Sequence, residues 1–145
     1  MAFIELKESS LNHNFNYLNN LFDKHGIEWG VVSKLLCGNR TYVKVLLDLG
    51  IHEIHDSRIT NLRVVKSLNK EIQTVYIKPP AKRSIKSVVR YADVSFNTEY
   101  ATIKMISEEA KRQGKKHKII IMIEMGDLRE GVMGEDLMDF YSSVF

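Results

Sequence analysis

WGVVSKLLCGN, residues 29–39, is the stretch around which the rest of the chain is organised. Its apolar run carries one lysine, Lys34, and stops at Gly38-Asn39, a pattern typical of a buried strand followed by the N-cap of a helix. We predict a strand over residues 28–36, with Lys34 at the carboxyl end where parallel α/β sheets bind ligands. Burial there would lower the pKa of Lys34 and favour the free amine that forms a Schiff base. A lysine that extends from the strand end into solvent fits the pattern as well.

Composition limits the classes of protein to consider. The chain has 145 residues, of which 44% are hydrophobic and 27% charged, so we predict one globular domain. The net charge of +3 does not predict a nucleic-acid partner, and the basic run at residues 111–118 is either a phosphate-binding patch or the solvated end of a helix. Cys37 is the only cysteine, so no intrachain disulfide is possible and a reducing, cytoplasmic location is expected. We expect neither a signal peptide nor a membrane span.

Short apolar runs alternate with amphipathic helical stretches along the chain. Further strands are predicted at residues 3–7, 51–55, 72–77, 94–96 and 118–124, the last being the clearest buried run. Helices are predicted between them, the first with Ser9 or Ser10 as its N-cap, and a last helix begins near residue 135. This pattern predicts an α/β fold with a parallel sheet, either an open doubly wound sheet or an arc of a (β/α)8 TIM barrel, which needs about 250 residues when complete. No GxGxxG or GxxxxGK[ST] phosphate loop occurs.

Two motifs resemble segments of one enzyme family. Residues 31–34 (VVSK) resemble the cofactor-lysine strand of the alanine racemase-like, fold-type III enzymes that use pyridoxal 5'-phosphate (PLP), and residues 11–14 (LNHN) resemble the helix before it. Residues 124–132 (EMGDLREGV) align without a gap with the family's Asp-Thr-Gly-Met-x-Arg-x-Gly segment. The exact residue patterns SKLLCG and GDLREG are most similar to those of the ornithine or alanine/ornithine racemase branch.

The resemblance implies a cofactor and two site residues. Lys34 would bind PLP covalently and act as one of two racemisation bases. Arg129 would hydrogen-bond the phenolic oxygen of PLP, because an arginine stays charged and offers a planar fork of donors. A loop arginine paired with Asp127 or Glu130 is the alternative interpretation of Arg129.

The resemblance also implies a domain organisation and an activity. Residues 9–145 would be the front part of the PLP-binding barrel, about five β/α units, and residues 1–8 a strand belonging to a C-terminal β domain outside this chain. The parent protein would be a homo-oligomer, such as a homodimer, that interconverts L- and D-amino acids (alanine, ornithine or similar) at Cα. The isolated chain would be inactive, because the later strands and the second base are outside it. No metal is implied. The competing interpretations are a non-catalytic PLP-binding homeostasis barrel and a half-barrel kept as an assembly module.

The sequence departs from alanine racemase itself at two places. Residues 36–39 (LCGN) stand where that enzyme has a tyrosine that contacts the phosphate, and Met122 stands at the position of its modified lysine. Further polar residues fall at the carboxyl ends of predicted strands and could line the same mouth of the barrel as Lys34. These residues are Asp56, Ser57, Lys78 and Asn97. Two of them, Asp56 and Asn97, fit equally well as helix caps or turn residues.

Overall fold

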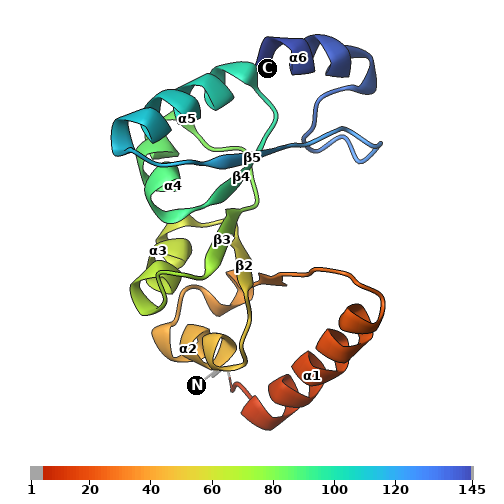
Figure 1. The fold of residues 1–145 in the computed structure, drawn as a ribbon, viewed down its shortest axis with the longest axis vertical. Coiled ribbons are helices and arrows are strands. Elements are labelled where there is room, and N and C mark those ends of the chain that lie inside the picture. Colours follow the sequence, from red (N-terminus) through yellow and green to blue (C-terminus); the bar gives the residue numbers. More distant parts are fainter. Residues whose placement is uncertain (1–4, 145) are drawn as a thin grey trace.

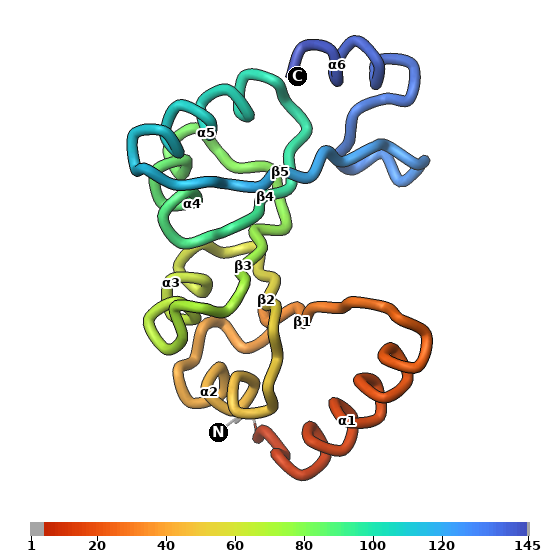
Figure 2. Tube along the Cα trace, in the orientation of Figure 1, coloured from red at the N-terminus to blue at the C-terminus, as the bar shows by residue number. Residues whose placement is uncertain are grey.

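Five parallel strands form one sheet in the computed structural model of the protein, which describes residues 5–144 (Figure 1). Each strand pairs with the next in chain order, β1-β2-β3-β4-β5, and the colour of the trace in Figure 2 accordingly changes steadily from strand to strand. A doubly wound sheet contains a point at which the strand order reverses, whereas a barrel does not. The predicted α/β fold of five β/α units is confirmed, and the sheet is an arc of a barrel. The strands span Val31–Val32 (β1), Glu53–Asp56 (β2), Gln73–Tyr76 (β3), Val94–Asn97 (β4) and Lys118–Ile121 (β5).

Helices follow the strands, and α2 to α5 lie along one side of the sheet (Figure 1). Asn39 caps α2 as predicted, because its Oδ1 accepts hydrogen bonds from the N–H groups of Thr41 at 3.0 Å and Tyr42 at 3.2 Å. Within residues 5–144, none of the helices is long and apolar enough to cross a membrane. The helices span Glu8–Lys24 (α1), Arg40–Asp48 (α2), Ile59–Leu68 (α3), Ile85–Tyr91 (α4), Tyr100–Gln113 (α5) and Leu137–Val144 (α6).

The hydrophobic core lies between the sheet and the helices that follow its strands. Ile54 of β2 has no exposed surface and belongs to one buried cluster with Val43 of α2 and with Leu62 and Val65 of α3. Each such aliphatic side chain stabilises the fold by about 1.5–3 kcal/mol relative to an exposed position. These contacts attach α2 and α3 firmly to β2, so the carboxyl ends of β1 and β2 have a rigid support.

The opposite face of the sheet is open. Side chains alternate along a strand, so Val32 of β1 and Ile120 of β5 face away from the core and are 50% and 43% exposed. β1 and β5 are also edge strands with a neighbour on one side only. Five strands do not close a barrel, and the apolar inner face therefore remains in contact with solvent.

Three predicted strands differ from the structure. β1 has two residues and does not extend over 28–36, because the chain leaves the sheet at Ser33 and enters a 3-10 helix, η1 (Lys34–Leu36). β5 is a half-exposed edge and not a buried strand, because the described residues provide no sixth strand to cover it. The strand predicted over residues 3–7 lies partly outside the described residues, and residues 5–7 have no regular secondary structure. The predicted serine cap is wrong as well, because Ser9 and Ser10 lie within α1.

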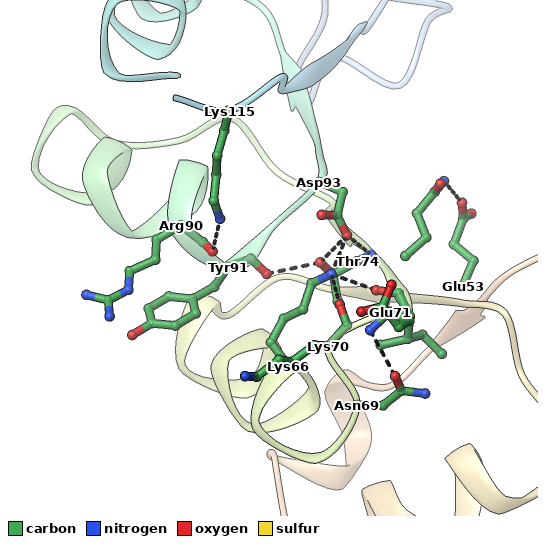
Figure 3. Close-up of polar contacts among 12 residues, drawn as sticks. Glu53, Lys66, Asn69, Lys70, Glu71, Thr74, Arg90, Tyr91, Asp93 and Lys115 are labelled. Atoms are coloured by element: carbon green, nitrogen blue, oxygen red, sulfur yellow. Dashed lines mark hydrogen bonds and ion pairs between the residues drawn. The ribbon is translucent and has the colours of Figure 1, made fainter. Parts of the chain in front are cut away.

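An ion pair joins α3 to the turn before β4 (Figure 3). Lys66 Nζ lies 2.8 Å from Asp93 Oδ2, and the same oxygen accepts hydrogen bonds from Thr74 N–H at 2.8 Å and Thr74 Oγ1 at 3.0 Å. Burial acts to raise the pKa of Asp93, but the bonds from Lys66 and Thr74 outweigh it, and the pKa is lowered. A carboxyl group with a lowered pKa stabilises the folded state above its unfolded pKa, and this stabilisation is lost as the pH falls through the folded pKa.

We therefore expect Asp93→Asn to destabilise the chain by about 1–2 kcal/mol at neutral pH, because it removes hydrogen bonds to a charged group. Urea unfolding at fixed protein concentration measures the change. The difference between wild type and variant should shrink as the pH falls below about 4, the ordinary pKa of an aspartate, because the unfolded wild-type chain takes up the proton before the folded chain does. Asp139→Asn is the control, since Asp139 is exposed on α6. A difference that is independent of pH would contradict the role given to the Asp93 charge.

Candidate functional site

Lys34 is the first residue of η1 and is separated from β1 only by Ser33, so it stands at the carboxyl end of an edge strand. Its side chain is exposed, and within residues 5–144 its amine forms no hydrogen bond or ion pair. Of the two interpretations of Lys34, the structure shows the side chain that extends into solvent and not the buried one, because the inner face of the sheet is open. The amine is accessible and unpaired, which is what covalent capture of an aldehyde requires.

A buried carboxyl group, Asp56, lies beside the residue that precedes Lys34. Asp56 Oδ2 accepts a hydrogen bond from Ser33 Oγ at 2.9 Å, and Asp56 Oδ1 accepts one from Arg58 N–H at 2.8 Å. Asn61 Nδ2 lies 3.1 Å from both oxygens. Burial, and then the nearby Asp56, raise the pKa of the neighbouring Tyr76 hydroxyl. Asp56, the last residue of β2, is thus a buried acceptor for these donors, and it does not line an open mouth.

The loop between β5 and α6 is closed by backbone hydrogen bonds. Val132 N–H donates to the carbonyl oxygen of Met122 at 2.8 Å, and Glu124 N–H donates to the carbonyl oxygen of Val132 at 2.9 Å. Glu124 Oε1 accepts hydrogen bonds from the N–H groups of Leu128 at 2.9 Å and Gly126 at 2.6 Å, and these bonds lower the pKa of Glu124. The segment that carries Arg129 therefore has a defined shape.

Arg129 lies on the exposed part of this loop. Its backbone N–H donates to Asp127 Oδ1 at 3.4 Å, but its guanidinium group forms no hydrogen bond or ion pair in the part of the chain that the structure describes. The alternative in which Arg129 pairs with Asp127 or Glu130 is therefore not observed there. An unpaired guanidinium group is free to bind an anionic oxygen.

Lys34 and Arg129 lie at the same end of the sheet but on opposite edges. Both follow the carboxyl ends of parallel strands, and β2, β3 and β4 separate their strands. Among the other predicted mouth residues, Asn97 is fully buried, Ser57 is partly buried and Lys78 is exposed. Asn97 donates to the carbonyl oxygen of Ser95 at 2.7 Å, so its amide faces its own strand. Residues 5–144 contain no group of three His, Cys, Asp or Glu side chains that could hold a metal ion.

Sequence reasoning missed Asn61, which is 5% exposed on α3. Its position on the apolar face of an amphipathic helix, beside Leu62, was the available signal, because a buried asparagine needs hydrogen-bond partners. The partner is Asp56, five residues earlier, which becomes a neighbour only when α3 folds back on β2.

Comparison with known proteins gives a consistent result. A protein-family model described as alanine racemase, N-terminal domain, matches residues 6–144. The ornithine racemase of Acetoanaerobium sticklandii is 36% identical over 137 residues, which cover 94% of this chain and 38% of that protein. The lysine racemase of Thermotoga maritima is 28% identical over 136 residues, with the same two shares. The chain thus spans about two fifths of the length of these curated relatives.

Solved structures share the fold. The D-threonine aldolase of Filomicrobium marinum superposes with a TM-score of 0.79 at 13% identity, over 96% of this chain and 39% of that chain. PipY of Synechococcus elongatus with PLP bound gives 0.75 at 12% identity, over 90% and 63%. The alanine racemase of Clostridium difficile gives 0.69 at 18% identity, over 91% and 38%. At these identities, the likeness shows the barrel fold and no more.

Proposed function

The chain belongs to the alanine racemase N-terminal domain family, and from that premise we propose that it forms the front half of the PLP-binding barrel of an amino-acid racemase, the parent protein. The observation that carries the proposal is an accessible, unpaired Lys34 at the carboxyl end of β1 together with an unpaired Arg129 on the loop after β5. The chain is similar to an ornithine racemase and a lysine racemase, and this similarity favours an amino acid with a side-chain amine as the substrate of the parent protein. Alanine is the other candidate substrate.

The residues present fit PLP, which carries an aldehyde, a phenolic oxygen and a phosphate. Lys34 offers a primary amine for the aldehyde, and Arg129 offers a permanent cation with paired N–H donors for the phenolic oxygen. Residues 36–39 (LCGN) contain no tyrosine for the phosphate. Contacts to the phosphate would therefore come from the rest of the barrel.

When bound, PLP supplies an electron sink that stabilises the charge left on Cα after a proton is removed. Lys34 Nζ would hold the cofactor and then move the Cα proton on one face of the substrate. Arg129 would fix the orientation of the ring and favour the unprotonated phenolic oxygen, because its charge persists at any working pH. The group that moves the proton on the opposite face would come from outside this chain.

The domain organisation of the parent protein is proposed from the same family membership. Residues 9–145 would supply the barrel arc, and residues 1–8 would pair with a C-terminal β domain. The parent protein would be a cytoplasmic homodimer, in which Cys37 stays reduced. The open inner face, with Val32 and Ile120 half-exposed, supports the view that further strands complete the barrel.

Racemisation by the parent protein is the direct test of the proposed function. L-Ornithine, L-lysine and L-alanine are incubated separately with the PLP-loaded parent protein in deuterated water, and the products are separated by chiral chromatography. We expect the D-enantiomer of at least one substrate to appear with deuterium at Cα. Tight PLP binding without any D-enantiomer or deuterium would instead support the non-catalytic PLP-binding barrel.

For the isolated 145-residue chain, we expect self-association, weak PLP binding and no racemisation. The unpaired edges and the apolar inner face leave backbone donors and aliphatic side chains in water. Sedimentation equilibrium measures the association. Ile120→Lys should weaken it by placing a charge on β5, whereas Tyr17→Lys, on the exposed face of α1, should not. A stable monomer at high concentration would contradict the half-barrel interpretation.

A further inference from the structure

We propose that a buried side-chain network of Ser33, Asp56 and Asn61 positions Lys34 for attachment of the cofactor. The three residues come from the end of β1, the end of β2 and the first turn of α3, and the turn that carries Lys34 lies against them. The proposal rests on the cofactor role proposed for Lys34. It makes the three residues positioning residues, since none of them needs to touch the cofactor.

The network fixes the residue that precedes Lys34. Ser33 is 3% exposed, and hydrogen bonds hold it to β2: its N–H donates to the carbonyl oxygen of His55 at 2.9 Å, and its Oγ lies 2.9 Å from Asp56 Oδ2 and 3.4 Å from the same carbonyl oxygen. Because the Lys34 side chain is exposed and has no partner within residues 5–144, only its backbone is held in place. Anchoring Ser33 through both backbone and side chain sets the direction in which the Lys34 side chain leaves the sheet.

Asn61 also contacts the other end of the turn. Gly38 has φ +69°, and a Cβ atom there would lie 2.8 Å from Asn61 Oδ1 and 3.2 Å from Asn61 Cα. Cys37, just before it, has φ +50°, a left-handed conformation that costs a residue with a side chain about 1 kcal/mol or more. The turn from Ser33 to Gly38 is therefore hydrogen-bonded to Asp56 at Ser33 and lies close against Asn61 at Gly38, where no side chain would fit.

Hydrogen bonds fix the position of the turn that carries Lys34 better than apolar packing would, because they are directional. Asp56 has no exposed surface, so an unsatisfied oxygen there would cost several kcal/mol, and all its donors must stay in place together. A displacement of about 1 Å at a reacting group lowers the rate by roughly a hundredfold. A rigid carboxyl group behind Ser33 therefore limits the displacement of Lys34.

Ser33→Ala removes the hydroxyl donor to Asp56 with little change in volume, and Asn61→Ala removes the amide that lies against both Asp56 oxygens. Thr74→Val is the matched control. Like Ser33, Thr74 is buried, and its hydroxyl group donates to an aspartate carboxyl group, at 3.0 Å from Asp93 (Figure 3). Thr74 lies on β3, however, and does not contact the turn. All variants are made in the 145-residue chain and compared at one protein concentration.

Backbone hydrogen exchange reports whether the turn is held. Losing a hydrogen bond to a charged group changes the free energy of local opening by about 1.5–3 kcal/mol, or roughly tenfold to a hundredfold. We expect peptides that cover residues 33–39 to exchange faster by this factor in both network variants but not in Thr74→Val. Exchange in α5 should be the same in all chains. Unchanged exchange at residues 33–39 in both network variants would overturn the proposal.

Reductive labelling reports whether the turn directs Lys34. Each chain is mixed with PLP and reduced with borohydride, and the label on Lys34 is compared with that on exposed Lys104 by peptide mapping. We expect the wild-type chain and Thr74→Val to label Lys34 preferentially, and the network variants to lose this preference. If the network variants keep it, the positioning role is wrong while the proposed function stands. If the wild-type chain shows no preference for Lys34, the positioning role is also wrong, whereas the proposed function is decided separately by racemisation in the parent protein.

Discussion

Lys34→Ala in the parent protein is expected to abolish covalent PLP attachment and to reduce racemisation to the detection limit. Alanine removes the amine that both holds the cofactor and moves the Cα proton, so this chain has no other group that could carry out either step. Absorbance of the bound cofactor and chiral chromatography measure the two losses. This is the largest effect expected of any single substitution in the chain.

Lys78→Ala is the matched control for this substitution. Lys78 is an exposed lysine that follows β3, so it also stands at the carboxyl end of a strand. Its replacement should leave covalent PLP attachment unchanged. If Lys34→Ala still forms a reducible PLP adduct at the same site, Lys34 is not the cofactor lysine.

Arg129→Ala should lower the turnover of the parent protein by about two to three orders of magnitude, the scale of losing one preorganised electrostatic donor. The loop between β5 and α6 keeps its shape without the guanidinium group, because its hydrogen bonds involve Glu124 and backbone groups. The loss should therefore come from the cofactor and not from misfolding, and the absorbance of bound PLP should shift. Steady-state kinetics and the cofactor spectrum measure it.

Arg129→Lys separates charge from geometry. A lysine keeps the positive charge but lacks the planar fork, so we expect turnover between that of the wild type and that of Arg129→Ala. Glu130→Gln, on the same loop, is the control and should have little effect. Wild-type turnover and an unchanged spectrum in Arg129→Ala would make Arg129 an ordinary loop residue.

The alternation of strands and helices was predictable from local patterns, but the spatial order of the strands and the limits of β1 were not. An apolar run such as residues 28–36 predicts a strand, yet the length of a strand depends on its neighbours. β1 pairs on one side only, and the bonds of Ser33 turn the chain out of the sheet after Val32. Ile120 is exposed for a related reason: β5 also pairs on one side only, and nothing within the described residues covers it there.

The candidate site was predictable only in part. Periodicity placed Lys34 at a strand end, whereas Arg129 came from the family resemblance, since a loop arginine has no distinctive local pattern. The positioning network escaped prediction because it joins three elements, and its contacts form only after α3 packs on β2. Asn61 in particular reads as a polar residue on the apolar face of α3 until Asp56 is placed beside it.

The central claim is that Lys34 carries the cofactor, and mapping the trapped cofactor tests it most directly. The PLP-loaded parent protein is reduced with borohydride and digested, and the peptides are identified by mass spectrometry. We expect the added pyridoxyl mass almost entirely on the peptide that contains Lys34. The same mass on another lysine, or spread evenly over exposed lysines such as Lys78 and Lys104, would contradict the account.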